Sequence, residues 1–204
     1  MEVCGPHTSI NFRTYGYDIM IYAPCSIINA ENISIGSHII IGDYSIINGG
    51  SSMQVGDYVH IAGNVSIIGG GETNIGDFVS VGYGARIITG TDSVMGDCLC
   101  NPTVPAKYRA CIRDITTLED HAFIGPNVVI YPGVTIGEGS VIGAGSVVTK
   151  NVDDWGVYIG QPARRVKDRP KEKMLRMVET LLSDERAKNI YRKPAYIPRP
   201  KIPY

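Results

Sequence analysis

Four histidines, His7, His38, His60 and His121, are the side chains of this 204-residue chain best suited to accept a proton near neutral pH. An imidazole ordinarily titrates near pH ~6.5, which suits a general base that takes a proton from an attacking group. Histidines also ligate zinc, but a zinc site built from them needs several close together. These four are far apart in the sequence, so we expect no metal and favour proton transfer.

The elements that must position these residues follow from a strong periodic signal. Aliphatic residues recur every six positions along most of the chain. Up to Ile87, every third interval contains two extra residues, whereas from Leu118 to Val148 every interval is six residues long. The positions are Ile21, Ile27, Ile35, Ile41, Ile47, Val55, Ile61, Ile67, Ile75, Val81, Ile87, Leu118, Ile124, Ile130, Ile136, Ile142 and Val148.

A period of six with these residue types predicts a parallel β-helix, an all-β solenoid. Each hexapeptide forms a short strand and a corner, and three of them make one triangular coil that pairs with the next coil about 4.8 Å away. The aliphatic residue points inward, and glycines that follow it, such as Gly36, Gly56 and Gly125, are expected to supply the corner's backbone angles. A second inward position is small or β-branched, as at Ser45, Val59, Val65, Ala85, Ala122, Val128, Ser140 and Ser146.

The period places the histidines on the coils. His60, in the stretch VGDYVHIAG, falls on an outward-facing strand position. His38 and His121 fall at corners, where we expect exposure to solvent, and His7 precedes the repeat. An exposed polar side chain without a chemical role is the alternative interpretation of His60.

Two segments depart from the repeat. An inserted loop occupies about residues 92–117 of a domain spanning 1–168, and a long insertion in a compact domain is more often functional than accidental. Residues 169–204 are expected to form a helix from about Pro170 to Lys188 and an extended proline-rich tail. Such a helix typically caps the open end of a solenoid, and the tail could pack onto a neighbouring subunit.

Composition excludes several classes of function. A net charge of -1 gives no electrostatic case for binding nucleic acid, and no apolar run approaches the ~18 residues of a membrane span. The first residues lack the form of a signal peptide. Five cysteines without regular spacing do not indicate a disulfide framework, so we expect a reduced, cytoplasmic compartment.

A family resemblance rests on three motifs: IGDFVSVGYGARIITGTD, HAFIGPNVVIYPGVTIGEGSVIGAGSVVTKNV and GQPARRV. They resemble the hexapeptide-repeat acyltransferases, in particular the galactoside, maltose and xenobiotic acetyltransferases, over roughly residues 15–166. The resemblance implies a left-handed β-helix, a homotrimer, acetyl-CoA as donor and active sites between subunits. The left hand rests on the resemblance alone, because parallel crossover connections are ordinarily right-handed.

Asp92 departs from the family's pattern, because the galactoside and maltose enzymes carry their histidine base at this position. An aspartate with a pKa near ~3.9 is a poor substitute. We therefore expect His60 to take the proton, since the matching strand of the family lines the inter-subunit site. Strand lengths separate His60 and Asp92 by roughly 16 Å in one chain, so Asp92 of an adjacent subunit is expected to orient the imidazole. His121 is the second candidate base.

The resemblance also assigns the donor site. Ala144, Thr149, Lys150 and Arg164 fall where the coenzyme runs toward the C-terminal end, and cations suit its phosphates. Phe123 occupies a position where relatives carry a tryptophan beside the acyl group. A charged corner residue without a ligand is the alternative interpretation of Lys150.

Tyr83, Tyr108 and Arg109 are the candidate contacts for the acceptor, because a tyrosine presents both a ring and a hydroxyl. Solvated loop charge is the alternative for Arg109. We expect O-acetylation of a sugar or cell-surface saccharide precursor, with N-acetylation of an amino-sugar nucleotide as the alternative. Alternatives of other classes are a non-catalytic trimeric scaffold and a zinc protein similar to the γ-class carbonic anhydrases, which share the β-helix.

Overall fold

The computed structural model describes residues 2–4 and 10–188. His7 and the proline-rich tail from residue 189 onward lie outside the described residues, so the expectations for them stay predictions. The chain divides into two units, Met1–Arg169 and Pro170–Tyr204. The first unit holds the β-strands, and the second holds the helix α1 (Glu172–Lys188), where a helix was predicted.

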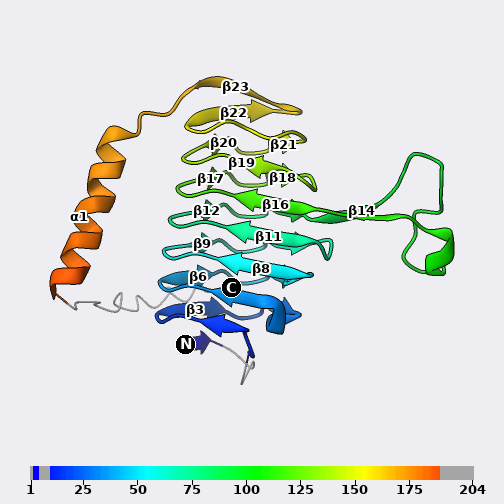
Figure 1. The fold of residues 1–204 in the computed structure, drawn as a ribbon, viewed down its shortest axis with the longest axis horizontal. Helices are drawn as coiled ribbons and strands as arrows, with labels where there is room; N and C mark the ends of the chain where they lie inside the picture. The colour runs from blue at the N-terminus through cyan, green and yellow to red at the C-terminus, as the bar shows by residue number, and fades with distance from the viewer. Residues whose placement is uncertain (1, 5–9, 189–204) are drawn as a thin grey trace, which may run out of the picture. The chain divides into compact units, whose positions relative to one another are not determined.

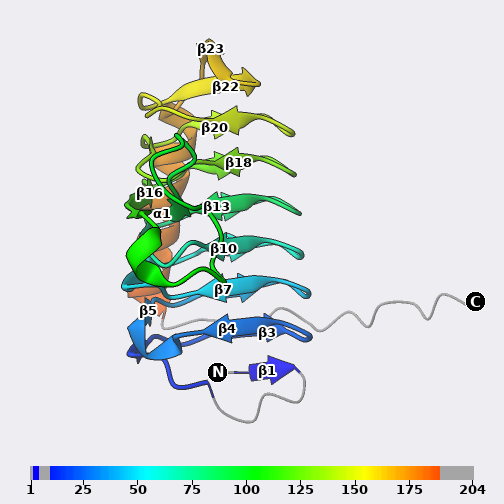
Figure 2. The ribbon, with the colours of Figure 1, turned by 90° about the vertical axis from the view of Figure 1, so that its right-hand side faces the viewer.

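The first unit is a parallel β-solenoid with one sheet on each of three faces (Figure 1, Figure 2). Face 1 contains β1 (Glu2–Cys4), β3 (Ile19–Tyr22), β6 (Ile39–Ile41), β9 (His60–Ile61), β12 (Ser80–Val81), β17 (Phe123–Ile124), β20 (Val141–Ile142), β22 (Gly156–Gly160) and β23 (Ala163–Asp168). Face 2 contains β4 (Ser26–Ile28), β7 (Ile46–Asn48), β10 (Ser66–Ile68), β13 (Arg86–Ile88), β18 (Val129–Ile130) and β21 (Val147–Val148). Face 3 contains β2 (Thr14–Tyr15), β5 (Ile33–Ile35), β8 (Ser52–Val55), β11 (Glu72–Ile75), β16 (Ile115–Leu118) and β19 (Thr135–Ile136), with the short 3-10 helix η1 (Ala30–Asn32) before β5.

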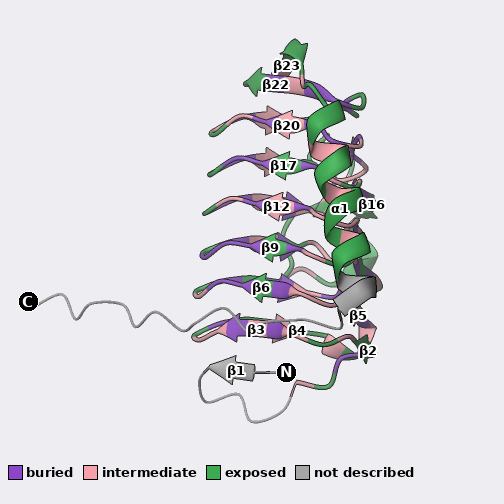
Figure 3. Cartoon of the chain, turned by 90° about the vertical axis from the view of Figure 1, so that its left-hand side faces the viewer, coloured by how far each residue is buried: buried purple, intermediate pink, exposed green. Residues whose placement is uncertain are grey.

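The core of the solenoid consists of the periodic side chains. All the predicted aliphatic positions are buried except Ile27, which is partly buried and packs against the core. The predicted small inward residues are buried too, and the Ser45 hydroxyl donates a hydrogen bond to the Ala62 carbonyl oxygen at 3.1 Å. Figure 3 shows buried residues alternating with intermediate or exposed residues along the strands from β3 to β22. The predicted hexapeptide core is confirmed.

The glycines that follow the aliphatic residues do not supply unusual backbone angles. Gly36, Gly56 and Gly125 are absent from the positive-φ residues, which include His38 (φ 62°) and Phe78 (φ 59°). A Cβ added at Gly36 would lie 2.5 Å from the Gly56 carbonyl oxygen in the next coil. These glycines therefore let the coils approach closely, and the prediction that they form the corners by their backbone freedom is wrong.

A column of rings runs along the corner between face 3 and face 1: His38, Tyr58, Phe78 and His121 are stacked, Tyr17 meets His38 edge-on, and Trp155 is tilted against His121. The ring centroids of His38 and Tyr58 are 4.5 Å apart, and those of Phe78 and His121 are 5.1 Å apart. The His38 side chain is only 6% exposed, and His121 is half-buried. The expected solvent exposure of these two histidines is wrong, because the repeat places rings from adjacent coils directly above and below them.

The outward surfaces of face 1 and face 3 differ in polarity. On face 3 the residues that pair from coil to coil are polar: Thr14, Ser34, Gln54, Asn74, Thr117 and Thr135. On face 1 the corresponding residues are mostly apolar: Met20, Ile40, His60, Ser80, Phe123, Val141 and Val157. Face 2 also exposes Ile28, Ile46 and Ile68. Face 3 is thus suited to water, whereas faces 1 and 2 present apolar surface.

The inserted loop spans residues 89–114, between β13 on face 2 and β16 on face 3. The repeat resumes at Ile115, a few residues before the predicted end of the loop. The loop starts as an antiparallel hairpin of β14 (Gly90–Asp92) and β15 (Cys111–Arg113), and one arm continues into the 3-10 helix η2 (Ala106–Tyr108). Figure 1 shows the hairpin extending away from the coils.

Among the described residues, no helix combines the length and the apolar character that crossing a membrane requires.

Candidate active site

His60 lies on the outward side of face 1, as predicted, at the start of β9. Its strand partners are Ile40 in the coil before and Ser80 in the coil after. These surroundings lower the pKa of His60 below its ordinary value of 6.5, because burial disfavours the charged imidazolium. The imidazole is therefore neutral at pH 7, which is the form that a general base requires.

Asp92 ends β14 and pairs with a cation from the opposite arm of the loop. Arg109 Nη2 donates a hydrogen bond to Asp92 Oδ1 at 2.7 Å, and the two side chains are only 21% and 11% exposed, respectively. The hydrogen bond from Arg109 to the carboxylate raises the pKa of Arg109. The pair joins the two arms of the hairpin.

His60 and Asp92 belong to different parts of the coil. β9 lies on face 1, whereas the loop leaves between face 2 and face 3. Among the described residues, Asp92 Oδ1 bonds to Arg109 and no hydrogen bond reaches Asp92 Oδ2. A contact between His60 and Asp92 of another subunit remains a prediction.

A first group of predicted site residues gathers on face 1 and its corner with face 2. Phe123 is 41% exposed on face 1, and one strand, β12, separates its strand from that of His60. Tyr83 lies at the adjoining corner, where its ring covers Gly63 so closely that a Cβ there would come within 2.8 Å of it. Ala144 occupies the same corner two coils further on and is exposed.

A second group gathers at the corner between face 2 and face 3. Thr149 and Lys150 are exposed at this corner, just after β21. The inserted loop with Asp92, Tyr108 and Arg109 leaves from the same corner two coils earlier. Tyr108 is exposed on η2, and an open hollow of about 590 Å³ lies between the loop's arms. The predicted residues thus form two groups on different corners of one chain.

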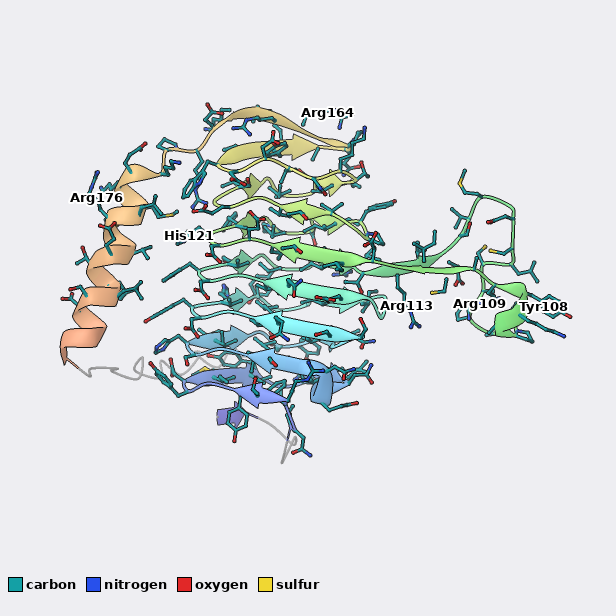
Figure 4. The ribbon with its side chains drawn as sticks, viewed as in Figure 1. Tyr108, Arg109, Arg113, His121, Arg164 and Arg176 are labelled. Atoms are coloured by element: carbon teal, nitrogen blue, oxygen red, sulfur yellow. The ribbon has the colours of Figure 1, made fainter. Side chains whose placement is uncertain are left out.

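Arg164 and Arg165 lie side by side on β23 but differ in their partners. Arg165 donates hydrogen bonds to Asp168 at 2.9 Å and to the Tyr158 hydroxyl at 3.3 Å. Among the described residues, the Arg164 guanidinium donates only to the carbonyl oxygen of the preceding residue, Ala163. Arg165 is therefore engaged in closing the last coil, whereas no other side chain of the described residues holds the Arg164 guanidinium. Figure 4 shows Arg164 at the end of the solenoid and Arg113 at the root of the loop.

Ser80 is a residue of this region that the sequence reasoning missed. It faces outward on face 1 between His60 and Phe123. A signal for it existed, because Ser80 follows His60 by 20 residues, which is the length of one coil in this part of the chain.

The three described histidines do not gather at one place. His38 and His121 belong to the aromatic column, with Tyr58 and Phe78 between them, whereas His60 lies on face 1. Within residues 2–4 and 10–188, no three His, Cys, Asp or Glu side chains form a group able to hold a metal ion.

Comparison with solved structures links this architecture to acyl transfer. AntD, an N-acyltransferase from Bacillus cereus, was solved as a serine-to-threonine variant with dTDP and coenzyme A; it is 33% identical over 86% of this chain and 92% of its own, with a TM-score of 0.79. A serine-to-cysteine variant with dTDP-4-amino-4,6-dideoxyglucose and coenzyme A is 33% identical over 85% and 92% of the chains, with a TM-score of 0.80. A hexapeptide-repeat acetyltransferase from Vibrio cholerae O1 biovar eltor, complexed with acetyl coenzyme A, is 26% identical over 78% and 73%, with a TM-score of 0.58.

One of the two sequence comparisons agrees with the structural ones. No curated protein matches the chain. The family model described as "Bacterial transferase hexapeptide (six repeats)" matches residues 115–150, and this repeat makes the solenoid a left-handed β-helix. With this repeat and with 33% identity to AntD over 86% of this chain, the protein belongs to the hexapeptide-repeat acyltransferases.

Proposed function

We propose that the enzyme transfers an acyl group from a coenzyme A thioester to the amino group of a nucleotide-linked sugar. The similarity to AntD, an N-acyltransferase solved with dTDP-4-amino-4,6-dideoxyglucose and coenzyme A, carries this choice of acceptor, and the ion pair between Asp92 and Arg109 is in keeping with it. The galactoside and maltose acetyltransferases that the sequence resembles have a histidine base where this chain has Asp92. Because Arg109 occupies Asp92 Oδ1, Asp92 does not present a free carboxylate in place of that histidine.

An amine acceptor fits this site because it needs less activation. An uncharged amine attacks the thioester through its lone pair, and a base removes a proton from nitrogen only as the new bond forms. A hydroxyl must lose its proton during the attack itself. The structure of AntD with dTDP-4-amino-4,6-dideoxyglucose and coenzyme A, at 33% identity, supports both the amine and the nucleotide.

O-Acylation of a saccharide is the second candidate, and His60 is the observation that favours it. Its lowered pKa keeps the imidazole neutral at pH 7, so it is able to deprotonate a hydroxyl placed beside it. Either product would be a modified sugar for saccharide assembly. We place the enzyme in the cytoplasm, where coenzyme A thioesters and nucleotide sugars are made.

For both reactions we assign the proton to His60 and its orientation to Asp92 of a second copy of the chain. Arg109 occupies Asp92 Oδ1, which leaves Oδ2 to accept a hydrogen bond from the imidazole. A carboxylate in that position fixes the histidine tautomer and stabilises its charged form.

A homotrimer would unite the two groups of site residues. His60, Tyr83 and Phe123 lie on one part of the chain, and the loop with Lys150 lies on another, so a second copy is needed to bring them together. The apolar stripe on face 1 supports this assembly, since large exposed apolar patches typically mark protein interfaces. The polar face 3 would remain in water.

The donor would lie along the same interface. Lys150 and Arg164 are exposed cations suited to the coenzyme's phosphates, and Phe123 would pack beside the acyl group. Ala144 and Thr149 would border the coenzyme's path, and Tyr83 and Tyr108 would contact the acceptor.

A matched pair of acceptors tests the proposal. Thiol release from acetyl-CoA is measured with a dTDP-linked 4-amino-4,6-dideoxy sugar and with the same nucleotide sugar carrying a 4-hydroxyl group. We expect release with the amine only. Release with the hydroxyl sugar or with maltose, and none with the amine, would replace N-acylation by O-acylation.

Mixed oligomers test whether the site is shared between subunits. Chains carrying His60→Ala and chains carrying Asp92→Ala are each expected to be slow, and refolding them together should restore part of the turnover. Restoration requires that the two residues of one site come from different chains. Turnover that stays at the average of the two parents would contradict the shared site.

A further inference from the structure

Arg113, at the root of the inserted loop, has a side chain that is packed against two glycines (Figure 4). Its Cγ lies 3.1 Å from the point that a Cβ of Gly90 would occupy, and its Nε, Cζ and Nη2 lie 3.4, 3.5 and 3.6 Å from the corresponding point at Gly70. Three atoms of one planar group at nearly equal distances from a point place that point above the plane. The guanidinium therefore lies flat over the glycine corner of the preceding coil.

The N–H donors of this guanidinium are not used within the described part of the chain. Among residues 2–4 and 10–188, no hydrogen bond or ion pair engages the Arg113 side chain, which is exposed. Arg86 differs, since its Nη1 donates to the carbonyl oxygens of Asn64 and Gly84 at 2.9 and 2.6 Å. Packing costs Arg113 rotamer freedom without a hydrogen bond in return, so its oriented donors are suited to a ligand.

The neighbouring carboxylate of Asp114 points away from this guanidinium. Asp114 Oδ1 accepts a hydrogen bond from the Ile115 N–H at 2.8 Å, and Oδ2 lies 2.6 Å from the point that a Cβ of Gly133 would occupy, in the following coil. Arg113 instead lies over Gly70, in the preceding coil. The positive charge of Arg113 therefore remains available to an anion.

The hairpin sets the distance between this charge and the proposed chemistry. Arg113 pairs with Gly90 and Cys111 pairs with Asp92, so Arg113 and Asp92 are diagonal neighbours on one side of the hairpin. Such neighbours are about 7–8 Å apart. In a nucleotide-linked 4-amino sugar, the amine and the diphosphate lie at opposite ends of one pyranose ring. A sugar whose amine reacts near Asp92 is thus able to place its diphosphate near Arg113.

We propose that Arg113 binds the diphosphate of the nucleotide-linked acceptor. This inference rests on the proposed function. The edge of a guanidinium donates two parallel hydrogen bonds to a phosphate, a geometry that a lysine ammonium does not reproduce. Coenzyme A also carries a diphosphate, but the position beside Asp92 favours the acceptor as the source. Because the diphosphate takes no part in bond making, the contact should affect binding of the acceptor and not the chemical step.

Three variants test the contact by calorimetric titration with dTDP. Arg113→Met keeps an aliphatic stem over Gly90 and removes the donors, so it should bind dTDP about 10–100-fold more weakly, the usual loss for hydrogen bonds to a charged group. Arg113→Lys keeps the charge and should recover part of the affinity. Arg176→Met removes an exposed cation from α1 and is the matched control, which should bind dTDP as the wild type does.

Two further ligands identify the group that Arg113 contacts. Thymidine lacks the diphosphate, so Arg113→Met should bind it as the wild type does, and binding of coenzyme A should also be unchanged. Wild-type protein that does not bind dTDP, or equal dTDP affinities of the wild type and Arg113→Met, would overturn the proposal. Weaker binding of coenzyme A with unchanged binding of dTDP would assign Arg113 to the donor and overturn it as well.

Turnover separates this contact from the proposed function. With a dTDP-linked 4-amino sugar, Arg113→Met should raise the acceptor KM about 10–100-fold and leave kcat nearly unchanged. An unchanged KM would overturn the contact and leave N-acylation intact. Wild-type enzyme that binds dTDP through Arg113 and releases no thiol with the amino sugar would count against the proposed reaction, while the diphosphate contact would stand.

Discussion

The coils of the solenoid and the inserted loop, residues 89–114, differ in what holds their backbone in place. Each coil repeats the same contacts: an inward aliphatic residue, a small inward partner and parallel pairing to both neighbours. The loop has a short hairpin at its root, the ion pair of Asp92 with Arg109, and a few hydrogen bonds such as Leu99 N to Tyr108 O at 2.9 Å.

This difference separates stability from function along the chain. Repeated burial makes the coils a rigid frame, because every coil is supported by the next. The loop buries little apolar surface, so its residues are available for contacts with substrate or with another subunit. The outward side of face 1 is the exception, because His60 lies on a strand of the rigid coils and is nevertheless proposed as the general base.

Removing the loop should produce the largest effect. Residues 89–114 are replaced by three glycines, copying the corner Gly69–Gly71 that links face 2 to face 3 one coil earlier. We expect no detectable turnover, because Asp92, Tyr108 and Arg109 are lost, while far-UV circular dichroism still reports the β-solenoid. Retained turnover would mean that the loop is not part of the site.

His60→Ala tests the proposed general base, which lies on a strand of the solenoid. We expect kcat to fall about 10²–10⁴-fold, the usual size of a general-base effect, with little change in stability. Because burial holds the pKa of His60 below 6.5, wild-type turnover should fall as the pH drops through that titration.

The fall in turnover at low pH should be absent in His60→Ala. His121→Phe is the control, because a phenyl ring can keep its place between Phe78 and Trp155 in the aromatic column. That variant should turn over normally. A slow His121→Phe enzyme beside a normal His60→Ala enzyme would assign the base to His121.

Two substitutions on one strand compare the contributions of a buried and an exposed side chain to the stability of the solenoid. Leu118→Ala on β16 should lower the free energy of unfolding by about 2–5 kcal/mol, because Leu118 is fully buried. Ile115→Ala, at the exposed start of the same strand, should change it by no more than about 0.5 kcal/mol. Chemical denaturation measures both, and equal losses would show that burial does not set the stability of this strand.

Arg164→Ala should give the smallest effect, about tenfold weaker binding of coenzyme A, since a phosphate hydrogen bond to a cation contributes about 1.5–3 kcal/mol when well formed. Lys167→Ala removes the same charge from the same strand and is the control. Thermal stabilisation by coenzyme A reports the affinity. Equal effects of the two variants would indicate a general charge effect instead of a contact by Arg164.

The coils were predictable because each hexapeptide buries its aliphatic residue in the same way. Burial at Ile124 follows the same rule as burial at Ile61 and Val81, so each coil confirms the assignment of the others. The aromatic column followed the same repeat, since His38, Tyr58 and Phe78 are 20 residues apart. It was missed because a corner residue was assumed to point into water, whereas stacking on adjacent coils covers it.

The loop was not predictable in the same way. The ion pair joins residues 17 apart that share no pattern with any other part of the chain. Nothing in their spacing distinguishes Arg109, which binds Asp92, from the exposed Lys107 two positions earlier. The role of Arg165 was equally hidden, because its partners Tyr158 and Asp168 meet it only where the last coil closes.

The aromatic column has a practical consequence for watching this protein unfold. Trp155, the only tryptophan in the sequence, ends that column beside His121 and is nearly buried. In a solenoid each coil contacts only its neighbours, so the terminal coils can open before the middle ones. Tryptophan fluorescence therefore reports the opening of the C-terminal coil alone, and comparing it with circular dichroism, which averages over all strands, distinguishes fraying from the end from cooperative loss of the whole solenoid.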